Sequence, residues 1–168
     1  MCPARRTIRR RPNATEGWCA ISQRSFEGPG VEALVAAARA QLDERFAGAG
    51  GIAAAALTDG GTVLTGVVFD PDWGGGGLCA ETGPLLEAHR RNEKIIAIAC
   101  VGRLSADDPS VILSPCGICK ERLFAWGGAV RIAVPMPEDP ARPMERTLDE
   151  LQPFYWVRAY ERRDARQT

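Results

Sequence analysis

Three cysteines and one glutamate give this sequence its clearest chemistry. Cys79 lies two residues before Glu81, and 36 residues separate Cys79 from Cys116, which pairs with Cys119. Residues three positions apart share one face of a helix, so Cys116 and Cys119 suit two ligands of one metal ion. Together with Cys79 they supply three thiolates, which leaves the fourth position of a tetrahedral Zn²⁺ open. An open position is typical of a catalytic zinc site, and Glu81 is placed beside the metal without having to bind it.

The same residues carry a resemblance to a known family. A Cys-x-Glu segment followed by Pro-Cys-x-x-Cys is a signature of zinc deaminases. It stands here as CAE (79–81) and PCGIC (115–119). With the segment SPCG (114–117) and the tail TLDELQPF (147–154), the sequence resembles the cytidine deaminase family, including its blasticidin S deaminase branch, over roughly residues 31–156.

The resemblance implies a reaction and a fold. Zn²⁺ held by Cys79, Cys116 and Cys119 would activate a water. Glu81 would carry protons between that water and a cytosine ring, which is hydrolytic deamination with release of ammonia. The implied fold is a three-layer α/β/α domain with a five-stranded mixed sheet, often assembled as a homotetramer, with a dimer as the alternative. Cytidine and deoxycytidine are the expected substrates, and a cytosine-nucleoside antibiotic such as blasticidin S or a modified pyrimidine base is the alternative.

The expected substrate contacts depart in part from the family pattern. Nucleoside deaminases of the family hold the ribose with Asn-x-Glu on the second hairpin strand, where this chain has Val68 and Asp70. Asp70 can accept a hydrogen bond from a sugar hydroxyl, whereas Val68 cannot replace the amide. The expected substrate-binding residues are Asp70, Phe69, Trp73, Ala80, Ser114, Pro115 and Phe154.

A second departure concerns the charge of the metal site. Three thiolates on Zn²⁺ make a centre of net negative charge. In many three-cysteine members of the family an arginine directly follows the glutamate and hydrogen-bonds the thiolates, but this chain has Thr82 there. Lys120 and Arg122 are the candidate replacements.

Two other interpretations of the cysteines stay open on the sequence. With Cys100 as a fourth ligand the site would be closed, a structural zinc site without catalysis. Alternatively, Cys116 and Cys119 have the CxxC spacing of thiol redox proteins, although this leaves Cys79 and Glu81 without a role. Metal content and activity on a cytosine compound distinguish the three interpretations.

Apolar periodicity predicts the elements that must position these residues. The last strand is expected to end at Pro135 and Pro137. The order of elements describes an α/β domain in which a mixed sheet is covered on both faces. Helices are predicted over 31–46, 79–91 and 116–126, a hairpin over 52–57 and 63–69 about an Asp-Gly turn, and strands over 95–101 and 130–134.

Composition sets the remaining limits. The 168 residues suit one domain, predicted over 30–157, with an arginine-rich flexible extension over 1–29 and a charged tail over 158–168. The 21 Lys plus Arg residues balance the 21 Asp plus Glu residues, which disfavours nucleic acid as a partner. No apolar run reaches the roughly 18 residues of a membrane span. Six unevenly spaced cysteines fit a reducing cytoplasm better than a secreted disulfide framework.

Overall fold

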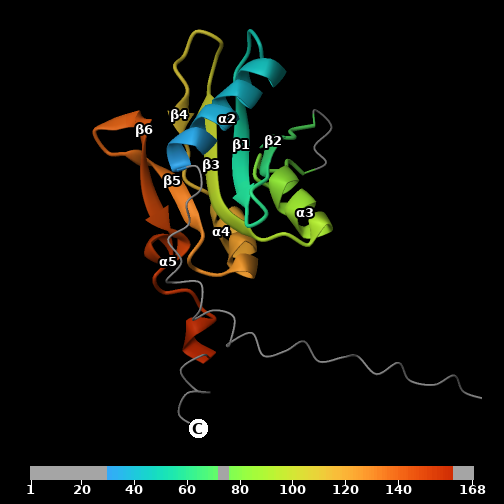
Figure 1. The fold of residues 1–168 in the computed structure, drawn as a ribbon. Coiled ribbons are helices and arrows are strands. Elements are labelled where there is room, and N and C mark those ends of the chain that lie inside the picture. Colours follow the sequence, from blue (N-terminus) through green and yellow to red (C-terminus); the bar gives the residue numbers. More distant parts are fainter. Residues whose placement is uncertain (1–29, 72–75, 161–168) are drawn as a thin grey trace, which may run out of the picture.

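The computed structural model describes residues 30–71 and 76–160. The predicted extension over 1–29, Trp73, and residues 161–168 of the predicted tail lie outside the described residues. No helix in the described part of the chain is both long and apolar enough to span a membrane. In chain order (Figure 1) the elements are α2 (Val31–Arg45), β1 (Gly51–Thr58), β2 (Val63–Val67), α3 (Thr82–Arg91), β3 (Ile95–Arg103), β4 (Val111–Ile112), α4 (Gly117–Leu123), the 3₁₀ helix η1 (Phe124–Trp126), β5 (Arg131–Met136), β6 (Asp139–Thr147) and α5 (Leu148–Leu151).

One mixed sheet forms the middle of the described chain. Its strand order is β2-β1-β3-β5-β6, with β4 paired to β3 off this path. Strand β3 runs parallel to β5, and all the other pairs are antiparallel. The predicted mixed sheet with helices on both faces is confirmed. The resemblance implied five strands, and the sixth is the two-residue β4, which pairs with Val101 and Gly102 of β3.

Strand β1 packs against both layers with small side chains. Ala53, Ala55 and Leu57 belong to the core cluster that includes the buried face of α2. Ala54 and Ala56 pack on the opposite face, in the clusters that contain Ala80 and the apolar side of α3. Successive residues of a strand point to opposite faces, so one alanine-rich run serves both layers. The short side chains let α2 lie close across β1 and β3 (Figure 1).

Helix α2 follows its predicted pattern. The residues buried along it are Leu34, Val35, Ala38 and Leu42, after Val31 at its first position. This spacing of three and four residues forms one apolar stripe. The stripe covers the face of β1 and β3 that lies away from the cysteines, so α2 stabilises the sheet without contributing to the site.

The two helices expected to carry the cysteines begin later than predicted. Residues 79–81 precede α3 as a turn, closed by a hydrogen bond from the Thr82 N–H to the Cys79 carbonyl (2.9 Å). Helix α4 begins at Gly117 with Cys116 as its extended N-cap residue, and η1 carries the chain on to Trp126, where the prediction ended the helix. Cys79 therefore lies ahead of a helix rather than within it.

Strand β6 is missing from the sequence prediction. The prediction that the last strand ends at Pro135 and Pro137 is wrong, because β5 continues to Met136 and turns back as β6. Pro135 faces Pro143 in the register of this hairpin. Strand β6 lies at the edge of the sheet, where proline is tolerated because the missing N–H interrupts no inner ladder. Pro135 and Pro137 therefore do not end the sheet, which continues from β5 into β6.

Gly66 of β2 allows the turn with Cys79 to approach the sheet. A Cβ atom at this position would lie 2.5 Å from the carbonyl oxygen of Ala80 and 2.5 Å from Cδ of Pro84. Both contacts are far shorter than van der Waals separation, and the first involves backbone. The absence of a side chain at Gly66 therefore sets the depth at which residues 79–81 pack.

Replacing Gly66 by alanine should lower the free energy of unfolding by about 1–3 kcal/mol, because the added methyl group overpacks against the turn. Gly83→Ala is the matched control, since its Cβ would meet the Cα of Gly66 at an ordinary 3.5 Å. Gly83 also lies in α3, where alanine is favoured over glycine by about 1 kcal/mol. Chemical denaturation measures both variants. A Gly66→Ala protein as stable as the unmodified protein would contradict the close approach.

Candidate metal centre and active site

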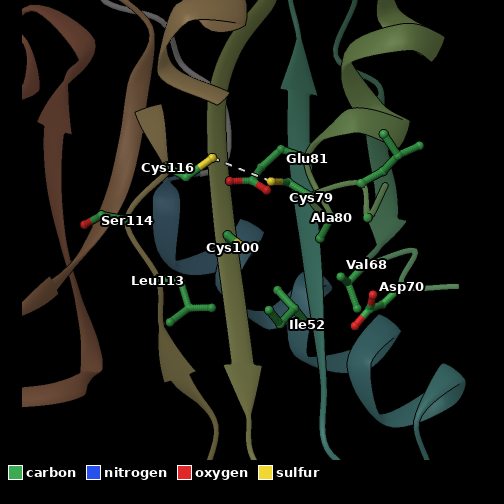
Figure 2. Close-up of a pocket in the computed structure, with 12 residues that line it drawn as sticks. Ile52, Val68, Asp70, Cys79, Ala80, Glu81, Cys100, Leu113, Ser114 and Cys116 are labelled. Carbon is green, nitrogen blue, oxygen red and sulfur yellow. Dashed lines mark hydrogen bonds between the residues drawn. The ribbon is translucent and has the colours of Figure 1, made fainter. Parts of the chain in front are cut away.

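Three thiols from distant parts of the chain lie together. The Sγ atoms of Cys79, Cys116 and Cys119 are all within 4.8 Å of one another. The Sγ atoms of Cys79 and Cys116 are 3.6 Å apart (Figure 2). Cys119 is buried, Cys79 is half-buried and Cys116 is exposed. The group is therefore accessible from one side and enclosed on the other.

The separation of the sulfur atoms fits a tetrahedral metal ion. A Zn–S bond of about 2.3 Å places two tetrahedral sulfur ligands about 3.8 Å apart, close to the 3.6 Å between Cys79 and Cys116. Cys100 is not part of this group in the described part of the chain, although it lines the same cavity. Three thiol donors could hold a metal ion and leave one position open, unlike the closed four-cysteine site considered above.

Backbone pairing brings the two cysteine segments to the same place. Beyond β4, the N–H of Leu113 donates to the carbonyl of Cys100 (2.9 Å), which keeps the chain beside β3 as it approaches Cys116. On the other side, Phe69 and Leu78 exchange two backbone hydrogen bonds (3.0 and 2.7 Å) just before Cys79. Both segments are thus fixed by the sheet, independently of any bond between the sulfur atoms.

The three thiols differ in acidity. Burial raises the pKa of Cys116, but hydrogen bonds from the backbone N–H groups of Cys119 and Ile118, together with the neighbouring thiols, outweigh burial and hold its pKa below the ordinary value. Burial first, and then the thiol of Cys116, raise the pKa of Cys79. Burial and the negative charge of Glu81 raise the pKa of Cys119 strongly. Cys116 is therefore the first of the three to carry a negative charge.

Glu81 lies beside the thiols as the N-cap residue of α3. It is 4% exposed, and its negative charge contributes to the raised pKa of both Cys79 and Cys119. Figure 2 shows its carboxylate turned toward Cys79 and Cys116. A buried carboxylate in this position is suited to moving protons to and from a group bound at the thiols.

A cavity of about 350 Å³ opens beside the thiols. In Figure 2 the carboxylate of Glu81 and the sulfur atoms lie at one end, and Val68 and Asp70 lie at the other. Mostly apolar walls with a few polar groups are typical of a site for a small ligand. The lining residues are Ile52, Val68, Asp70, Gly77, Leu78, Cys79, Ala80, Glu81, Cys100, Leu113, Ser114 and Cys116.

Known proteins are similar to this chain in sequence and in fold. A cytidine deaminase of Mycobacterium tuberculosis is 35% identical over 103 residues, which are 61% of this chain and 69% of that protein. The chain belongs to the cytidine deaminase family. The crystal structure of the cytidine deaminase from Bacillus anthracis is 33% identical, with a TM-score of 0.73 over 80% of this chain and 95% of that chain. A crystal structure of the M. tuberculosis enzyme is 26% identical over 76% of this chain and 98% of that chain, with a TM-score of 0.57. No family model matches the chain.

Three of the substrate-binding residues expected for this cytidine deaminase family member line the cavity. They are Asp70, Ala80 and Ser114. Asp70 is exposed and lies at the end of the cavity opposite the thiols, while Ala80 is buried against the sheet. These positions leave room for a ligand between the metal-binding end and Asp70.

Three of the other expected substrate contacts, Phe69, Pro115 and Phe154, are not among the described residues that line the cavity. Phe69 is 57% exposed and pairs through its backbone with Leu78, and Pro115 is buried. Phe154 is 95% exposed after α5 and does not line the cavity. Trp73 lies outside the described residues. Their roles stay predictions.

Sequence reasoning missed part of the apolar wall. Ile52, Leu78 and Leu113 line the cavity, yet in the sequence they are indistinguishable from core positions of strands and loops. Leu78 and Leu113 directly precede Cys79 and Ser114, and adjacency to a predicted site residue is the signal that identifies them. Ile52 has no such signal, because its place in the wall depends on the pairing of β1 with β3.

Replacing Cys119 by serine should reduce the bound metal of the purified protein to well below one equivalent, because a neutral hydroxyl is a poor substitute for a thiolate. Cys100→Ser is the matched control, since Cys100 is also buried and lines the same cavity but stands outside the thiol group. Elemental analysis measures the metal in both variants. Equal loss of metal from the two variants would contradict a site of three cysteines.

Proposed function

We propose that this protein is a zinc-dependent hydrolase that deaminates a cytosine-type nucleoside, with cytidine and deoxycytidine as the first candidates. The observation that carries the proposal is the convergence of three thiols beside the buried carboxylate of Glu81 at one end of a cavity. Membership of the cytidine deaminase family supports the same reaction. Water replaces the amino group at C4 of the ring, so that the products are the uracil nucleoside and ammonia.

Cys79, Cys116 and Cys119 would hold the zinc ion. The bound ion would supply the Lewis acidity that makes water reactive at neutral pH. The backbone N–H groups of Ile118 and Cys119 favour the thiolate of Cys116, which prepares one ligand before metal binding. The group of described residues supplies three sulfur donors and no fourth, so one coordination position of the ion would be left for the water.

Glu81 does the proton chemistry in this proposal. One carboxylate oxygen accepts a proton from the attacking water. The carboxylate delivers this first proton to the ring nitrogen N3. It then accepts the second proton from the hydroxyl that has added at C4 and delivers it to the amino group, which leaves as ammonia, so no net proton stays on the protein. Within the described residues the carboxylate of Glu81 accepts no hydrogen bond from the protein, and Glu81 lines the cavity. Its oxygen atoms are therefore open toward a water and a substrate bound in the cavity.

The far end of the cavity would recognise the sugar. Asp70 accepts a hydrogen bond from a sugar hydroxyl, while Val68 offers only an apolar contact. This apolar contact, in the place of the family's amide, favours a second candidate substrate class, a cytosine-nucleoside antibiotic or a modified pyrimidine base. A panel of cytosine, cytidine, deoxycytidine, blasticidin S and modified pyrimidines, assayed by ammonia release, distinguishes the candidates.

Glu81→Gln should lower kcat by about 10²–10⁴-fold, because the amide cannot accept and return a proton. Zinc content should stay near one equivalent, since the thiols are unchanged. Glu87→Gln is the matched control: Glu87 lies on α3 as well, but it faces solvent and pairs with Arg90 and Arg91. Ammonia release and elemental analysis measure the two properties. An active Glu81→Gln enzyme would remove Glu81 from the mechanism.

We further propose that the enzyme works in pyrimidine salvage in the cytoplasm, as a homotetramer. A reducing compartment keeps the three thiols free for the metal. Phe154 is 95% and Trp156 61% exposed, and large aromatic side chains of this kind are enriched at protein interfaces.

Light scattering after size-exclusion chromatography should give about four times the 18.1 kDa mass of one chain. Phe154→Asp should shift the protein toward smaller species, because a charge at an interface core is strongly unfavourable. A fully active monomer would contradict the proposed assembly.

A further inference from the structure

Besides the contact between Cys79 and Cys116, a side-chain hydrogen bond from Arg122 to Thr82 joins the two segments that carry the thiols. Nη1 of Arg122 donates to Oγ1 of Thr82 at 3.0 Å, across 40 positions of sequence. Arg122 stands three residues after Cys119 on α4, one turn along the same helix. Thr82 is the first residue of α3, directly after Glu81, and it is 8% exposed. The bond therefore fixes the segment of Cys79 and Glu81 against the helix of Cys119.

The charge of Arg122 is not neutralised by a carboxylate. Within residues 30–71 and 76–160, no ion pair involves Arg122. Three thiolates and one divalent cation add up to a net charge of −1, and Glu81 contributes a further negative charge nearby. An unpaired guanidinium held at Thr82 is placed to offset this excess, and arginine keeps its charge at every relevant pH.

Lys120 is the nearby cation that does not have this connection. It is half-buried and directly follows Cys119, yet in the described chain its ammonium group makes no hydrogen bond or ion pair. The guanidinium of Arg122, by contrast, is held in place by its hydrogen bond to Thr82. The sequence offered Lys120 and Arg122 as equal candidates, and the structure favours Arg122 because only its side chain is bonded to Thr82.

We propose, resting on the proposed function, that Arg122 is a positioning residue of the metal centre. It ties the Glu81 turn to α4 through Thr82, and its positive charge favours the negatively charged metal–thiolate centre. Arg122 does not line the cavity, so it acts on the metal centre and not on the substrate. Because Arg122 is exposed, solvent screens its charge, and its effect is moderate.

The test compares zinc affinity and steady-state kinetics of the full-length protein with four variants, using competition with a chromophoric chelator at neutral pH. Arg122→Gln should lose about tenfold in zinc affinity, as is usual for outer partners of metal ligands. Its kcat should fall while KM stays unchanged. Arg122→Lys, which keeps the charge and a donor, should restore most of the affinity. Lys120→Gln should behave as the unmodified protein.

Thr82→Val keeps the arginine but removes the acceptor, so it should lose part of the zinc affinity. If Arg122→Gln does not fold, the zinc affinity of Thr82→Val tests the role of Arg122 instead. The inference is overturned if Arg122→Gln binds zinc as tightly as the unmodified protein, if Arg122→Lys restores nothing, or if a folded Thr82→Val is unchanged. These outcomes leave the proposed function standing. An unmodified protein that binds no zinc or releases no ammonia from any cytosine compound would instead refute the proposed function.

Discussion

The structure depends on holding three thiols, those of Cys79, Cys116 and Cys119, within 4.8 Å of one another. Each thiol becomes negative when it loses its proton, and like charges at this distance repel strongly where water is partly excluded. A divalent cation among them converts the repulsion into attraction. The rest of the protein must bring the three thiols together, because no disulfide bond joins them and the Sγ atoms of Cys79 and Cys116 share only a weak hydrogen bond of 3.6 Å. Rigid backbone pairing, rather than the side chains of the site, therefore comes first.

The sheet supplies that rigidity through small residues at the points of closest approach. Ala54, Ala80 and Cys100 form one buried cluster beneath the cavity, and Gly66 leaves space for the backbone of Ala80. Larger side chains at these points would lift the 79–81 turn away from the sheet and separate Cys79 from the other two thiols. The same alanine-rich strand β1 lets α2 pack closely on the opposite face. Small side chains in the sheet thus allow both the close packing of α2 and the approach of the 79–81 turn that sets the geometry of the site.

The prediction of the fold succeeded where the signal was local. The apolar stripe of α2 and the Asp-Gly turn between β1 and β2 depend on neighbours a few residues apart, and both elements are present where they were expected. It failed at β6, because the last strand was expected to end at Pro135 and Pro137, whereas the chain turns back there and β6 lies at the edge of the sheet, where prolines are tolerated. It also began α3 at Cys79 instead of Thr82, since a turn that caps a helix has nearly the same composition as the helix start.

The sequence by itself determined the chemistry of the site and the family, because thiolate and carboxylate donors at fixed spacings are properties of residue type and order. Tertiary structure alone decided which further groups stand around that chemistry. It placed Ile52 in the cavity wall, left Cys100 outside the group of donors, and joined Arg122 rather than Lys120 to Thr82. These relations connect residues far apart along the chain, and their formation depends on strand register and helix packing, which no local pattern of side chains encodes.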